Sequence, residues 1–192
     1  MVGFTCRMDG KCCRIYWVPV THLDVFRIVY YGDFKPEEFL KPHEGSSSSI
    51  PSIKTRRREY CLALRQDMGK CVFLLDNGKC SIHEFKPLTC RFYPFVYVTR
   101  NGKAIDIDVY SKALGKCPGL VMDKNPINTN LRNQLLGLAN IRLVEIKLYH
   151  EAISNLLSEF NSNPSIQEAI DFLVDKAKKD YYRLRANKLW VK

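Results

Sequence analysis

Seven of the eight cysteines in this chain lie in one ordered array, and the array limits what the chain can fold around. The first three form a C-x5-C-C motif, the next three are spaced nine and ten residues apart, and the last stands in a Cys-Pro-Gly step. Thiolates are the ligands that soft metals and iron–sulfur clusters select. The array therefore predicts a metal centre, with the candidate ligands Cys6, Cys12, Cys13, Cys71, Cys80, Cys90 and Cys117.

Composition favours metal binding over disulfide bonds. The chain has 192 residues and is 46% hydrophobic, enough for a core that needs no cysteine staples. Its start, "MVGFTCRMDGKCC", lacks the basic region and apolar run of a signal peptide, and no run of about eighteen apolar residues could form a transmembrane segment. We therefore expect a cytoplasmic protein, in which reduced thiols bind a metal or do redox chemistry.

The formal net charge of +10 favours acidic partners such as RNA, the ribosome or an anionic membrane surface. A lysine-rich, solvated surface is the simpler interpretation of the same charge. The densest basic run is "KTRRR" at 54–58, and the last predicted helix interleaves basic with aromatic residues. The candidate nucleic-acid contacts are Lys54, Arg56, Arg57, Arg58, Lys178, Lys179 and Arg183.

Local signals predict the elements of the first 122 residues. Thr21 followed by Asp24 predicts the start of a helix that ends near Gly32, and a short helix is expected from Pro36. Residues 42–52 have the composition of a flexible loop, strands are expected at 59–66 and 71–75, and a helical turn at 81–85 should stop at Pro87. Residues 1–16 are expected to form a loop that carries the first three cysteines.

A β-hairpin is the clearest local prediction. Asn101-Gly102 is the preferred two-residue turn, and it separates "FVYVTR" from "KAIDIDVY". In the second strand Asp106 and Asp108 alternate with apolar residues, so one face should be buried. That buried face is expected to hold Ile105, Ile107 and Val109.

Two helices are expected after about residue 128, separated by a break at 161–164, and the second carries an apolar stripe from Ile166 to Leu184. The predicted fold class is α+β. A small cysteine-rich metal-binding core with a β-hairpin, residues 1–122, is followed by a helical C-terminal extension, residues 123–192, that packs on the core as a helical hairpin.

The cysteines belong to a longer signature. It reads F-x-C-x3-G-x-C-C from Phe4, then C-V-F-L-x3-G-x-C-x-I-H-x3-P-x2-C-R-x-Y-P-F from Cys71, then C-P-G from Cys117. This signature resembles the YkgJ-type cysteine-cluster proteins, the zinc- or iron-chelating CxxCxxCC domain family, over roughly residues 4–119. The resemblance implies a metal site more firmly than an activity. One position departs from it, because Asp9 stands where the family usually has the second cysteine.

The resemblance also places two other side chains in the metal-binding motif. Arg91 could neutralise a thiolate cluster and hydrogen-bond to sulfur, and a surface ion pair is the alternative. His83 could ligate a metal through its imidazole, but packing beside the ligands is the favoured interpretation. Cys61 lies outside the signature in an apolar strand, where a buried structural thiol is expected.

Four thiolates hold one [4Fe–4S] cluster or one structural zinc ion, so seven exceed the needs of one site. The favoured set joins Cys12 or Cys13 to Cys80 and Cys90, with Cys71 or Cys117 as the fourth ligand. The surplus thiols could form a second site or serve as redox partners, and the partition is left open.

Three functions compete. The favoured one is an iron–sulfur protein, with a [4Fe–4S] cluster, that acts in electron transfer or redox sensing with a redox protein partner. The alternative is a zinc-stabilised module that binds RNA or a ribonucleoprotein through its basic surface. A third is an enzyme that uses the surplus thiols, although the chain has no P-loop, G-x-G-x-x-G, G-x-S-x-G or H-E-x-x-H motif.

Overall fold

Helix α2 (His22–Gly32) starts where the sequence predicts, because its cap is complete. In the computed structural model, which describes residues 1–123 and 126–192, the Thr21 hydroxyl accepts a hydrogen bond from the Asp24 N–H. The Asp24 carboxylate accepts one from the Thr21 N–H in return. Helix α2 ends at Gly32, and the predicted short helix follows as α3 (Pro36–Phe39).

The strands of the described residues form four small antiparallel sheets. The largest has the order β2 (Leu40–Glu44), β4 (Glu59–Leu64), β3 (Ile53–Lys54), and its central strand β4 confirms the strand predicted at 59–66. The prediction of a loop at 42–52 is wrong for residues 42–44, because these residues belong to β2 and pair with β4. Two other sheets join β1 (Gly3–Phe4) to β9 (Leu120–Val121) and β5 (Gln66–Asp67) to β6 (Lys70–Cys71).

The prediction of a strand at 71–75 is also wrong. Strand β6 ends at Cys71, and the chain then turns so that Leu74 forms an isolated bridge with Cys80. The helical turn expected before Pro87 is confirmed as η1 (His83–Phe85). Beyond that proline lies a helix that was not predicted, α4 (Leu88–Phe92), and another, α1 (Lys11–Ile15), lies in the expected loop at 1–16.

The hairpin forms as predicted, from β7 (Phe95–Arg100) and β8 (Lys103–Val109), with Asn101 and Gly102 both at positive φ. Ile107 is buried, but the prediction for Ile105 is wrong, because its side chain is 41% exposed. The strand register shifts between Val98 and Thr99, and Ala104 is the neighbouring buried residue in β8. The short helix η2 (Ser111–Ala113) follows the hairpin.

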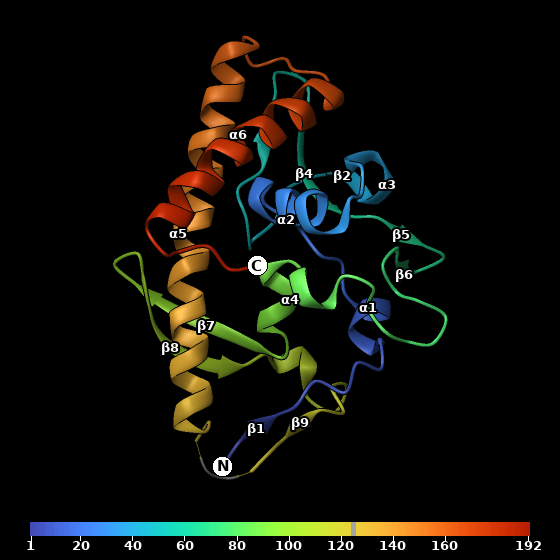
Figure 1. The fold of residues 1–192 in the computed structure, drawn as a ribbon, viewed down its shortest axis with the longest axis vertical. Coiled ribbons are helices and arrows are strands. Elements are labelled where there is room, and N and C mark those ends of the chain that lie inside the picture. Colours follow the sequence, from blue (N-terminus) through green and yellow to red (C-terminus); the bar gives the residue numbers. More distant parts are fainter. Residues whose placement is uncertain (124–125) are drawn as a thin grey trace.

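Helices α5 (Thr129–Glu159) and α6 (Ile166–Ala186) confirm the predicted C-terminal pair and, with the sheets, an α+β fold. Figure 1 shows α5 along the whole length of the molecule, with the hairpin beside one half and α6 folded back across the other. The apolar stripe of α6 is buried from Ile170 to Leu184. No helix within residues 1–123 and 126–192 combines the length and apolar character needed to cross a membrane.

The main apolar core draws on both predicted parts of the chain. Tyr149 and Leu156 of α5 and Leu173 of α6 share one cluster with Ile28 of α2 and Leu62 of β4. The predicted extension starts at residue 123 and includes residues 124–125, which lie outside the described residues. A boundary at 122 stays a prediction.

Candidate metal centre

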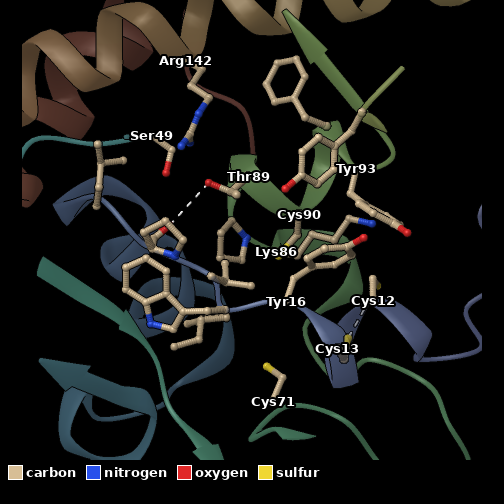
Figure 2. Close-up of a pocket in the computed structure, with 18 of the residues that line it drawn as sticks. Cys12, Cys13, Tyr16, Ser49, Cys71, Lys86, Thr89, Cys90, Tyr93 and Arg142 are labelled. Carbon is tan, nitrogen blue, oxygen red and sulfur yellow. Dashed lines mark hydrogen bonds between the residues drawn. The ribbon is translucent and has the colours of Figure 1, made fainter. Parts of the chain in front are cut away.

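Six of the seven cysteines in the array line one cavity of about 970 Å³. Figure 2 shows Cys12 and Cys13 on α1, with Cys71 and Cys90 on other walls of this cavity. Cys117 lines a smaller neighbouring cavity together with three of those six. Cys61 lines neither cavity and is buried within β4, as expected of a structural thiol. The cysteines that line the main cavity are Cys6, Cys12, Cys13, Cys71, Cys80 and Cys90.

Gly10 lets the first cysteine motif lie against the second. Its φ is +69°, and a Cβ built there would lie 2.5 Å from Cδ1 of Leu74 and 2.8 Å from the carbonyl oxygen of Gly78. Helix α1 begins one residue later and carries Cys12. The Asp9 carboxylate accepts a hydrogen bond from the Lys11 N–H at 3.1 Å, so this side chain helps to form the turn before α1.

Gly119 allows a similar close approach between the segments that carry Cys6 and Cys117, the first and last cysteines of the array. A Cβ at this position would lie 2.1 Å from the carbonyl oxygen of Thr5, so only glycine allows the two backbones to approach this closely. The Thr5 N–H donates to the Gly119 carbonyl at 3.0 Å. This contact places Cys6 and Cys117, which are far apart in the sequence, on the wall of one small cavity.

Cys90 is held in place through helix α4. The Leu88 N–H, in the first turn of α4, donates to the Asp24 carboxylate at 2.9 Å. That carboxylate is fully buried on α2 and also accepts from Arg27, which in turn donates to Glu145 of α5. A buried charge network between α2 and α5 therefore positions the helix that carries Cys90.

Burial and mutual contact shift the pKa values of these thiols. A hydrogen bond with Cys13, whose Sγ lies 3.9 Å away, lowers the pKa of Cys12 to about 7 and raises that of Cys13. Burial raises the pKa of Cys71 to about 11 and also raises the pKa values of Cys80 and Cys90. Burial thus favours the neutral forms of Cys71, Cys80 and Cys90, and a bound metal would stabilise their thiolate forms.

The donor set suits a thiolate-ligated metal. No three Cys, His, Asp or Glu side chains within residues 1–123 and 126–192 lie close enough together to hold a metal ion. Six thiols instead surround a cavity.

Lys86 is a charged neighbour of the thiols that sequence reasoning missed. Its positive charge favours the thiolate forms of Cys12, Cys80 and Cys90. The only signal in the sequence was its place inside the second cysteine motif, immediately before a proline.

Arg91 and His83 both lie near the cysteines. Arg91 donates to the carbonyl oxygens of Glu84 at 2.8 Å and Lys86 at 3.2 Å, and also to that of Lys192, so it ties the turn before α4 to the C-terminal segment. It lines the smaller cavity beside Cys90. His83 lines the main cavity, and burial lowers its pKa. Contact of either side chain with a bound metal stays a prediction.

The seven basic residues proposed for nucleic-acid contact are all exposed, but they belong to two separate segments. The Arg56 N–H donates to the Ser162 carbonyl at 2.9 Å, which joins the run at 54–58 to the turn before α6. Lys178 lies about 18 Å along α6 from Ile166, at 1.5 Å per residue. Lys179 pairs with Asp175 at 3.0 Å.

Comparison with known proteins places the cysteine array within a described domain family. The family model CxxCxxCC, described as "Putative zinc- or iron-chelating domain", matches residues 5–118, a range that holds every cysteine of the array. The chain belongs to the CxxCxxCC family. The match supports metal binding as the general property of the CxxCxxCC region.

A curated relative is the "Uncharacterized protein MJ0661" of Methanocaldococcus jannaschii. It is 29% identical over 123 residues, which cover 63% of this chain and 60% of the relative. The chain therefore spans less than two thirds of that relative's length. No solved structure matches the chain.

Proposed function

We propose that this chain binds a [4Fe–4S] cluster through four of its cysteines and acts in electron transfer or redox sensing in the cytoplasm. The observation that carries the proposal is that six thiols line one cavity, because ligands on several walls of a cavity suit the separate irons of a cluster better than a single zinc. Membership of the CxxCxxCC family supports metal binding in general. When bound, such a cluster supplies one-electron chemistry.

The proposed ligands are Cys12, Cys71, Cys80 and Cys90. These four thiols line the same cavity, and Cys12, Cys71 and Cys80 all raise the pKa of Cys90, as expected of close neighbours. Lys86 offsets part of the negative charge that four thiolates bring. Phe92 and Tyr93 line the same cavity and limit the access of water, a factor that tunes the potential of thiolate-bound clusters.

Anaerobic purification with metal analysis tests the proposal. We expect about four iron atoms and four acid-labile sulfides per chain, with visible absorbance that dithionite bleaches. Colourless protein with stoichiometric zinc and no sulfide would overturn the cluster and leave a zinc site.

Variants of two cysteines with different environments test the ligand set. Cys80→Ser should lose most of the iron, because the thiol lines the cavity, whereas Cys61→Ser should keep it, because that thiol lies in the core of β4. Both variants are compared by circular dichroism. Equal iron in folded Cys80→Ser and native protein would exclude Cys80 as a ligand.

A zinc-stabilised RNA-binding module is the second candidate. The net charge of +10 and the exposure of Arg56, Arg57 and Lys178 favour it. We rank it second because the basic segments lie apart. The test is RNA binding at low salt by native protein and by an Arg56→Glu, Arg57→Glu double variant, since phosphate contacts weaken steeply with salt and with lost charge.

A further inference from the structure

The cavity that holds the thiols continues to a second, polar end at Arg142 of α5. This side chain is 3% exposed and lines the cavity. Figure 2 shows its guanidinium directed from the helix into the pocket, at the end where Ser49 and Thr89 also lie and away from Cys71. Its Nη1 has no hydrogen-bond partner among the described residues.

The carboxylates near Arg142 have other partners. Asp24 lies 3.9 Å from Nη1 of Arg142, which is too far for a hydrogen bond. The Asp24 carboxylate instead accepts from Thr21, Leu88 and Arg27, and Glu145 accepts from both terminal nitrogens of Arg27. Arg142 is thus the member of the buried charge network that has donors to spare. A buried guanidinium with free donors is unfavourable unless an acceptor reaches it from the cavity.

We propose that this end of the cavity binds the carboxylate of a small organic acid, whose apolar body extends toward the thiols. One carboxylate can accept from the unpartnered Nη1 of Arg142, whereas a doubly charged phosphate would bring a second negative charge close to Asp24 and Glu145. A planar guanidinium also matches a carboxylate in geometry. Ser49 lines the same end, and its hydroxyl, which lies 2.9 Å from that of Ser47, can donate to a carboxylate while it accepts from Ser47.

The walls between the two ends suit an apolar body. They include Trp17, Tyr97, Leu143 and Ile146, together with the aromatic residues already described beside the thiols. Pockets that bind small molecules combine mostly apolar walls with a few polar groups that fix orientation. The proposal goes beyond the metal centre and does not depend on which metal it holds.

Calorimetric titration of the anaerobically purified protein tests this site. The probes are ω-phenyl carboxylates from phenylacetate to 5-phenylvalerate, each paired with the alcohol of the same length. We expect at least one acid to bind ten or more times more tightly than its alcohol. Equal affinities throughout, or no binding by any acid, would overturn the proposal.

Two arginine variants on the same helix separate this site from general effects of charge. Arg142→Gln should weaken binding of the best acid at least tenfold and leave the alcohol unchanged. Arg132→Gln, which removes an exposed ion pair with Asp106, should change neither. A folded Arg142→Gln variant with native affinity for the acid would refute the role of Arg142.

Ser49→Ala provides the second test if Arg142→Gln does not fold. We expect this variant to bind the acid more weakly than the native protein does. Native affinity for the acid would count against the site. Metal content is measured in every sample. Because acid binding and metal content are read separately, failure of the carboxylate site and failure of the proposed metal centre give different results.

Discussion

At the scale of single residues, two glycines allow the cysteine motifs to meet. Gly10 has no room for a methyl group, because a Cβ would press on the Gly78 backbone and the Leu74 side chain. Leu74 can move, but the carbonyl of Gly78 belongs to the turn that leads to Cys80. The glycine in the first motif therefore serves the contact between motifs as well as its own turn.

Gly10→Ala should reduce the free energy of unfolding by about 2–5 kcal/mol, the sum of left-handed backbone strain and overpacking. Gly69→Ala is the matched control, since its φ is +75° but nothing lies within 4 Å of the added Cβ. The control should cost only about 1–2 kcal/mol from backbone strain. Urea unfolding of both variants checks the difference, and equal losses would contradict the contact with Gly78.

The sequence identified the cysteine array and Arg91 beside it, but not Lys86 or Arg142. The array can be recognised because the cysteines within each motif are close together in the sequence. Six of the seven line one cavity. Lys86 reaches the same cavity from the turn before α4, and Arg142 reaches it from α5. Nothing local distinguishes Arg142 from other arginines of a long helix, because its environment is created by tertiary contacts with α2.

At the scale of elements, the charge network between α2 and α5 holds these two helices and α4 in place relative to one another. Arg27 is fully buried, holds Asp24 and Glu145, and lies with its guanidinium carbon 4.2 Å from the centre of the Trp190 ring. Asp24 then caps the backbone of α4. The network thus connects two long helices to the short helix that carries Cys90.

Arg27→Met should reduce the free energy of unfolding by about 3–5 kcal/mol, because it leaves two buried carboxylates without their cation. Arg132→Met removes an exposed pair at 37% side-chain exposure and should cost about 1 kcal/mol or less. The measurement is urea unfolding at neutral pH. A loss for Arg27→Met no larger than that for Arg132→Met would show that the network adds little.

Elements with strong local signals could be predicted, and the others could not. The capping box at Thr21 and the Asn101-Gly102 turn both specify their elements within four residues. Helices α1 and α4 have five residues each, too few for an apolar period to be visible. The exposure of Ile105 follows from an irregular register between the strands, which alternation alone does not reveal.

At the scale of the whole molecule, α5 connects regions that would otherwise lie apart. One half packs against the hairpin, where Asn140 accepts a hydrogen bond from the Ala104 N–H at 3.1 Å. The other half packs on α2 and α6, where His22 lies 3.0 Å from Asp180 and stacks on Tyr149. The predicted core and the predicted extension are therefore joined by polar as well as apolar contacts.

The buried pair of His22 and Asp180 should make stability depend on pH. Burial lowers the pKa of His22, although Asp180 opposes the shift. The unfolded chain therefore takes up this proton first as the pH falls below about 6.5, and acid favours unfolding. Removal of the imidazole with His22→Gln should reduce the loss of unfolding free energy between pH 7.5 and pH 5.5 by up to about 1.4 kcal/mol.

His150, an exposed residue of α5, provides the control. His150→Gln should show the native loss between the two pH values, measured by urea unfolding at each. The same loss in His22→Gln and native protein would mean that His22 does not contribute to the pH dependence.

The contact between Thr5 and Gly119 has a consequence for chain entropy. It places Cys6 and Cys117, which are outside the proposed four-cysteine ligand set, on the wall of one small cavity across more than half of the chain. A second metal bound to both would close a loop of about 110 residues. In the chain-entropy model, closing a loop of about 100 residues lowers the free energy of the folded state relative to the unfolded ensemble by nearly 5 kcal/mol. A metal shared by these two thiols would then act as a reversible cross-link, and its loss would destabilise the fold of the whole intervening segment.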